Sequence, residues 1–164
     1  MAAAFAALLA AFAAVWGVAQ QSAGPRDDPR PGDALIDQWA GSYDVDAFFA
    51  LPGIRSELEA LLGDELELLF HNLDVKGDID LVRGALSVAG NAPHGGTEEE
   101  AVVCVVPGTL AVHAAILTAG QINVYTRGAG YDALPLCIKD WITLVSAAYV
   151  DRFEQPGYVK VLQR

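Results

Sequence analysis

The chain has 164 residues, with 21 Asp and Glu against 10 Lys and Arg, which gives a formal net charge of −11 at pH 7. This excess of acid excludes a nucleic-acid binder that works through phosphate contacts, because such proteins gather Lys and Arg on one surface. The length suits one domain with a hydrophobic core and is too short for two ordinary domains once a leader is removed.

The chain begins with an apolar stretch. No Asp, Glu, Lys or Arg precedes Arg26, and residues 1–19 are apolar except for Gly17. Such a stretch, followed by small residues, is typical of a secretory signal peptide. An uncleaved membrane anchor is the alternative, but most of these residues are alanine, which enters lipid only weakly. We expect residues 1–19 to be a signal peptide, and the mature protein to be periplasmic or secreted with no stable membrane span.

A proline-rich segment follows. Residues 20–34 hold three prolines, several charges and few apolar side chains. A segment of this composition cannot bury enough apolar surface to order itself, so a disordered linker is predicted. The remaining residues, 35–164, are expected to form a single folded domain.

Helical signals open this domain. Asp44 is suited to cap a short helical turn through Phe48 and Phe49. Apolar residues then recur at a spacing of three and four over residues 51–62, the pattern of one helical face, and Gly63 stands where a left-handed C-cap is expected.

A further short helix is predicted over residues 66–73. Asp64 and Glu67 have the spacing of an N-terminal cap that precedes it.

Beyond residue 77 the spacing of the apolar residues changes from the helical period to alternation. Ile79 and Leu81 alternate with acidic residues, which is typical of a strand.

Strand patterns dominate the second half. Short turns separate strands predicted at residues 85–89, 101–106, 110–117 and 122–125, and short turns favour an antiparallel meander. Apolar residues return to helical spacing over 134–145, and residues 158–162 have the pattern of an edge strand. The predicted fold class is α+β: an antiparallel sheet of four to five strands with N-terminal and C-terminal helices packed on one face. The other face is expected to be wetter and to carry Asp78 and Asp80.

The segment between two predicted strands, residues 90–97, combines a Pro-His pair with four glycine and asparagine neighbours. Loops on rigid scaffolds are favoured binding positions, and a proline restricts the backbone beside the single imidazole. We expect a binding site formed by Asn91, Pro93, His94, Gly95 and Gly96. An ordinary hairpin loop with an incidental surface histidine is the alternative.

Motifs for catalysis are absent from the sequence. It contains no nucleophile elbow, phosphate-binding loop, His-Glu-x-x-His or Cys-x-x-Cys. We therefore assign no catalytic residue, metal or cofactor and expect a binding protein rather than an enzyme. Two alternatives stay open. One is a small envelope hydrolase or metal-binding protein that uses His94 with nearby acids, either Asp78 and Asp80 or Glu98, Glu99 and Glu100. The other is a structural envelope protein that associates with itself through the wetter sheet face.

The two cysteines, Cys104 and Cys137, fall in segments with core-like neighbours. In an oxidising compartment an even number of cysteines permits one disulfide. Two separately buried thiols are the alternative, because the sequence does not show whether the Cα atoms come within reach.

The segment Asn91-Ala92-Pro93-His94-Gly95-Gly96 resembles the Cys-x-Pro-His-x-Cys loop of the bacterial periplasmic inhibitors of vertebrate lysozyme, the Ivy family. The order of elements over residues 51–142 is also similar. The resemblance implies an α+β fold, a basic lysozyme-type hydrolase as the protein partner, and His94 as the residue that approaches the catalytic carboxylates of the enzyme. It also leaves a homodimer open.

This sequence departs from the family at both loop cysteines, which are replaced by Asn91 and Gly96. A loop without that disulfide is expected to lose affinity, because ordering its glycines on binding costs conformational entropy. The positions of Cys104 and Cys137 do not allow them to restore the bond.

Overall fold

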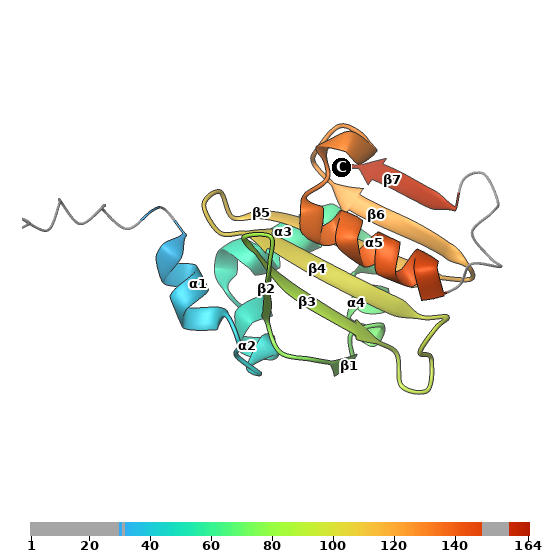
Figure 1. Ribbon diagram of the computed structural model, residues 1–164, viewed down its shortest axis with the longest axis horizontal. Helices are drawn as coiled ribbons and strands as arrows, with labels where there is room; N and C mark the ends of the chain where they lie inside the picture. Colours follow the sequence, from blue (N-terminus) through green and yellow to red (C-terminus); the bar gives the residue numbers. More distant parts are fainter. Residues whose placement is uncertain (1–29, 31, 149–157) are drawn as a thin grey trace, which may run out of the picture.

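The computed structural model describes residue 30 and residues 32–148 and 158–164 (Figure 1). The predicted signal peptide, residues 1–19, and most of the predicted linker, residues 20–34, lie outside the described residues. Helix α1 begins at Asp33, two residues before the expected start of the folded domain. In the part of the chain that the structure describes, no helix has the length and apolar character needed to cross a bilayer.

Short helices make up the N-terminal half of the domain. They are α1 (Asp33–Trp39), α2 (Val45–Phe49), α3 (Pro52–Leu62), the 3-10 turn η1 (Gly63–Glu65) and α4 (Leu66–His71). Asp44 caps α2 as expected, since its side chain accepts a hydrogen bond from the backbone N–H of Ala47 at 3.3 Å. Gly63 ends α3 with φ 54°, in the region that favours glycine.

The predicted cap of α4 by Asp64 and Glu67 is wrong. The residue that precedes α4 is Glu65, which has right-handed helical angles and no side-chain capping hydrogen bond. A capping side chain needs an extended residue from which to fold back onto the helix. Here η1 leads directly into α4, so the chain is already helical where the cap would stand.

Seven strands form one sheet, so the expected number of four to five strands is too low. They are β1 (Val75–Lys76), β2 (Asp80–Val82), β3 (Ala85–Asn91), β4 (Glu100–Val106), β5 (Ala111–Thr118), β6 (Gln121–Thr126) and β7 (Val159–Gln163). The order is β1-β3-β4-β5-β6-β7, and β2 also pairs with β3. All pairs are antiparallel except β6 with β7, which is parallel. The turn η2 (Tyr131–Ala133) and helix α5 (Leu136–Ala148) lie between these two strands in sequence.

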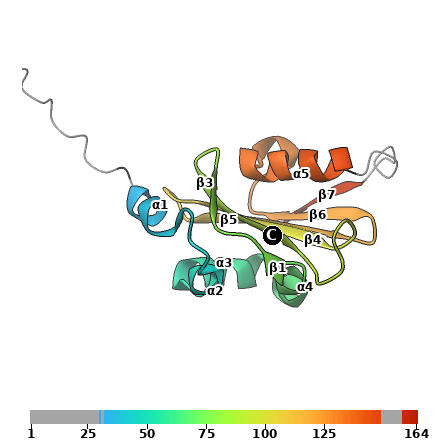
Figure 2. The same cartoon turned by 60° about the horizontal axis from the view of Figure 1, so that its bottom comes forward.

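The α+β class is confirmed, but the helices cover both faces of the sheet, so the expectation of one covered face is wrong. Figure 2 shows α5 on one side of the sheet and α2, α3 and α4 on the other. Within β4, Val103 and Val105 pack into the cluster of the N-terminal helices, whereas Val102 and Cys104 pack into the cluster of α5. Neighbouring residues of a strand point to opposite faces, so an uninterrupted apolar run such as residues 101–106 is typical of a strand buried on both.

Cys104 and Cys137 are joined by a disulfide, with Cα atoms 6.4 Å apart. The bond ties β4 to the first turn of α5 on the face opposite the N-terminal helices. It therefore fastens the C-terminal helix to the sheet and does not close the loop between β3 and β4.

Candidate binding site

The loop between β3 and β4 presents Pro93 and His94 at its tip. Ala92 is fully buried, whereas Pro93 and His94 are exposed. The backbone N–H of Gly95 donates to the carbonyl of Ala92 at 2.9 Å, which closes a four-residue turn. His94 has φ 62°, in the left-handed region that residues other than glycine rarely adopt. Proline followed by a positive φ is typical of a type II turn, whose second corner is normally glycine.

Backbone hydrogen bonds join this turn to the residues that follow it in the loop. The N–H groups of Glu98 and Glu99 donate to the carbonyl of Gly95 at 3.0 and 2.8 Å, and the N–H of Ala92 donates to the carbonyl of Glu99 at 2.9 Å. The Asn91 side chain also donates to the carbonyl of Ala92 at 2.8 Å. The loop is thus tied together without a disulfide of its own, so the ordering cost expected from its glycines is reduced in the folded protein.

Close approach explains one of the loop glycines. A Cβ at Gly95 would lie 2.9 Å from Oε2 of Glu99 and 3.0 Å from Cβ of Ala92, so the Glu99 side chain and the turn would both have to shift to admit it. At Gly96 a Cβ would meet only the Asn91 side chain, at 3.8 Å or more. Gly95 is therefore the more tightly surrounded of the two glycines.

Two further elements border the loop. His71, the last residue of α4, places Nε2 4.0 Å from Oε2 of Glu99, with both side chains about half exposed. On the other side, β1 pairs with the last two residues of β3, Lys76 opposite Gly90 and Val75 opposite Asn91. The loop consequently stands at one end of the sheet, between the end of α4 and the short strand β1.

Of the acids that the sequence suggested as partners of His94, Asp80 is placed away from the loop by the strand register. Asp80 pairs with Ser87 in β3, four residues before Asn91 and therefore about 13 Å away along the strand. Among the described residues no group of three or more His, Cys, Asp or Glu side chains is placed to hold a metal ion. The structure therefore brings together the loop residues and separates them from Asp80.

His113 lies elsewhere, in β5 opposite Cys104. Its Nδ1 is 2.9 Å from Oγ1 of the fully buried Thr126. Burial lowers the pKa of His113 from its ordinary value of 6.5. This histidine is a hydrogen-bonded part of the sheet.

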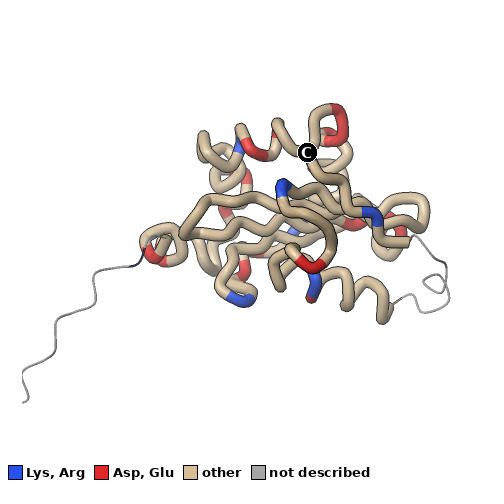
Figure 3. Tube along the Cα trace, turned by 90° about the horizontal axis from the view of Figure 1, so that it is seen from above, with Lys and Arg blue, Asp and Glu red and all other residues tan. Residues whose placement is uncertain are grey.

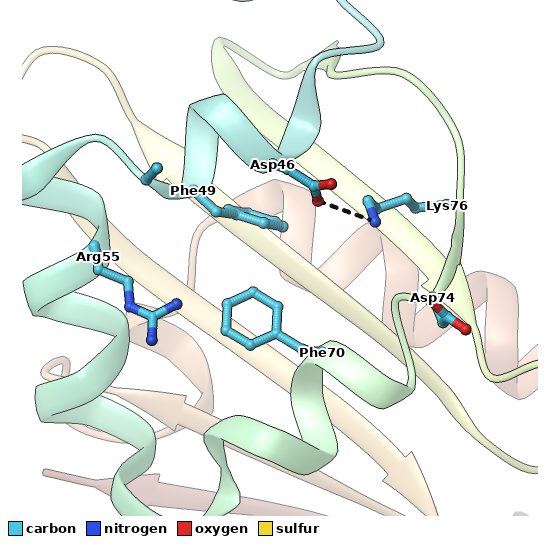
Figure 4. Close-up of a pocket in the computed structure, with 7 residues that line it drawn as sticks. Asp46, Phe49, Arg55, Phe70, Asp74 and Lys76 are labelled. Atoms are coloured by element: carbon cyan, nitrogen blue, oxygen red, sulfur yellow. Dashed lines mark ion pairs between the residues drawn. The ribbon is translucent and has the colours of Figure 1, made fainter.

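An open cavity of about 570 Å³ lies between α2, α3, α4 and β1 (Figure 4). Its aromatic wall is formed by Phe49 and Phe70, and the Arg55 guanidinium lies 5.4 Å from the Phe70 ring centroid. Lys76 Nζ pairs with Oδ1 of Asp46 at 3.2 Å across the mouth. No local spacing reveals this cavity, because its lining comes from four separate elements.

The acidic residues are distributed over the molecule rather than collected on one face (Figure 3). The overall charge therefore favours a basic partner but does not select a contact surface.

Comparison with known proteins gives one finding. A family model described as inhibitor of vertebrate lysozyme (Ivy) matches residues 53–147, more than half of the chain. The matched range runs from α3 to the last turn of α5 and includes the whole loop between β3 and β4. No curated protein and no solved structure shows significant similarity to the chain.

Proposed function

The chain belongs to the inhibitor of vertebrate lysozyme (Ivy) family, and from this membership we propose that it acts outside the cytoplasm by inserting the Pro93-His94 tip into the cleft of a lysozyme-type hydrolase. The observation that carries the proposal is the turn itself. It holds an exposed imidazole at its corner with φ 62°. Residues held in rarely populated backbone regions concentrate at functional sites.

The chemistry of the tip suits such an enzyme. Glycosidases of the lysozyme type work with a pair of carboxyl groups that flank the bond they cleave. An imidazole N–H donates to a carboxylate, and the protonated ring makes the stronger, charge-assisted bond. His94 therefore has the donor that would engage these groups and block access of the substrate.

The shape of the tip also supports insertion. Gly95 and Gly96 follow the imidazole directly, so no side chain widens the loop on that side. The hydrogen bonds from Gly95, Glu98 and Glu99 order the turn before binding. A loop that is ordered before binding loses less conformational entropy on association than a flexible loop.

The net charge of −11 supports a basic enzyme as the partner. Opposite net charges speed the encounter of two proteins and add specificity more than affinity. The alternative of a structural protein that associates with itself through a wetter sheet face is not supported, because helices cover both faces of the sheet. A homodimer through another surface stays a proposal without an assigned residue.

The test is inhibition of purified vertebrate lysozyme by the protein, by His94→Ala and by a matched control, Leu110→Ala. Leu110 is also a non-glycine residue with positive φ, 55°, but it lies in the turn at the opposite end of β4. We expect His94→Ala to lose inhibition with an unchanged melting temperature, while Leu110→Ala inhibits like the parent protein. Equal inhibition by all three would remove the tip from the proposal.

A further inference from the structure

The end of α4 contacts the point where the loop rejoins the sheet. Asn72 directly follows α4 and is fully buried. Its side-chain Nδ2 donates to the carbonyl of Glu100 at 3.3 Å and to the carbonyl of Leu117 at 3.0 Å. Glu100 and Leu117 are partners across β4 and β5. One amide therefore joins a helix end to two strands at the base of the loop.

The neighbouring residue makes a parallel contact. His71 reaches the carboxylate of Glu99, with Nε2 and Oε2 4.0 Å apart. Glu99 is also the residue whose backbone N–H and carbonyl hold Gly95 and Ala92. Consecutive residues of the helix end thus contact consecutive residues of the loop end, directly behind the turn that carries His94.

The buried side-chain amide of Asn72 has one polar atom that lowers stability. Asn72 Oδ1 is buried and has no hydrogen-bond partner among the described residues. An unsatisfied buried polar atom destabilises a protein, and an apolar side chain of similar volume would avoid that loss. The two donors of this side chain go to the carbonyls of Glu100 and Leu117, so the asparagine ties the end of α4 to both strands at the base of the loop although its Oδ1 lacks a partner within the described part of the chain.

We propose that Asn72, assisted by His71, is a positioning residue that fixes the direction in which the Pro93-His94 tip leaves the sheet; this role rests on the proposed function of the tip. Asn72 carries most of the effect, because its hydrogen bonds are buried. The contribution of His71 is smaller, since an ion pair between exposed side chains is worth little.

The first test compares Asn72→Ala with Thr126→Val. Thr126 is a fully buried polar residue at the end of β6, away from the loop, and the substitution removes the hydrogen bonds of its hydroxyl with the N–H of Gly128 and with Nδ1 of His113. We expect Asn72→Ala to speed hydrogen exchange at the amides of Ala92, Gly95 and Glu99 and to weaken binding of vertebrate lysozyme about tenfold, a change of about 1.4 kcal/mol. Thr126→Val should lower the melting temperature without either effect.

Asn72→Leu, which keeps the branched shape of the side chain and removes its donors, serves if Asn72→Ala fails to fold. Unchanged exchange at these amides in the folded Asn72 variant would overturn the proposal, as would equal loop exchange in Thr126→Val. The exchange measurement needs no partner. If the parent protein does not bind lysozyme at all, the proposed function fails while the positioning role is still decided.

A rescue distinguishes positioning from a general loss of stability. A Cβ at Gly96 would lie 3.9 Å from Cγ of Asn91, so the side chains of residues 91 and 96 are neighbours across the loop and two cysteines there can be tested for a disulfide. Adding Asn91→Cys and Gly96→Cys to Asn72→Ala, with the new bond verified by peptide mapping, should restore loop protection and affinity. An oxidised loop that leaves both at the level of Asn72→Ala would contradict the positioning role.

Discussion

Replacing His94 by glycine should stabilise the protein and abolish its inhibitory activity in the same variant. His94 adopts φ 62° at the second corner of the turn, a position that glycine occupies without steric cost. The substitution therefore removes backbone strain from the fold and, at the same time, the only imidazole of the loop. Opposite signs for stability and function are the signature of a residue kept for binding.

The expected gain follows from two opposing quantities. A side chain in the left-handed region costs about 1–2 kcal/mol, and glycine loses about 0.5–1 kcal/mol more conformational entropy on folding than other residues. The His94 side chain is exposed, so little packing is lost. The net effect is a stabilisation of about 0.5–1 kcal/mol, equivalent to a rise in melting temperature of about 2–3 °C for a domain of this size.

The assay is thermal unfolding by circular dichroism beside inhibition of vertebrate lysozyme. Leu110→Gly is the control, because it relaxes a positive φ of 55° in a different hairpin and should leave inhibition intact. A lower melting temperature for His94→Gly would refute the reasoning about strain. Retained inhibition would refute the assignment of the imidazole to binding.

Three further predictions follow from the structure. Replacing Cys104 and Cys137 by alanine removes a link between residues 33 positions apart and should lower the unfolding free energy by about 3–4 kcal/mol in urea titrations; loss of inhibition by the still-folded variant would contradict the separation of this bond from the loop. Because burial lowers the pKa of His113 in the folded state, the unfolded state takes up the proton first. Stability should therefore fall as the pH drops from about 6.5 through the lower folded pKa, and His113→Gln should remove that slope in melting temperatures measured between pH 7 and 4. Gly95→Ala should lower both melting temperature and inhibition, since its Cβ would lie 2.9 Å from Oε2 of Glu99; a variant as stable as the parent would show that the turn has room to relax.

The loop and the helix α3 were predictable because their signals are local. Proline, histidine and glycine in adjacent positions define a turn, and Gly63 marks a helix end by its own conformational freedom. The packing of α5 on the second face could not be derived in this way. The apolar run of β4 is typical of a strand buried on both faces, yet only one covered face was expected, because the helix that covers each face is set by contacts far apart in sequence.

The features that hold the loop in place are also non-local. Asn72 is a single asparagine after a helix, and nothing near it in sequence indicates that its amide reaches Glu100 and Leu117. The disulfide was left open at the level of the sequence, since only the fold shows that β4 and α5 bring Cys104 and Cys137 together. The idea that Asp80 acts with His94 failed because strand register places it opposite Ser87.

Calorimetric titration of the protein and of His94→Ala with purified vertebrate lysozyme tests the central claim most directly. We predict a dissociation constant below about 1 μM for the parent protein, equivalent to a binding free energy of about −8 kcal/mol, and no measurable binding for the variant. Equal affinity of the two proteins, or no heat of binding with the parent, would contradict insertion of the Pro93-His94 tip into the enzyme.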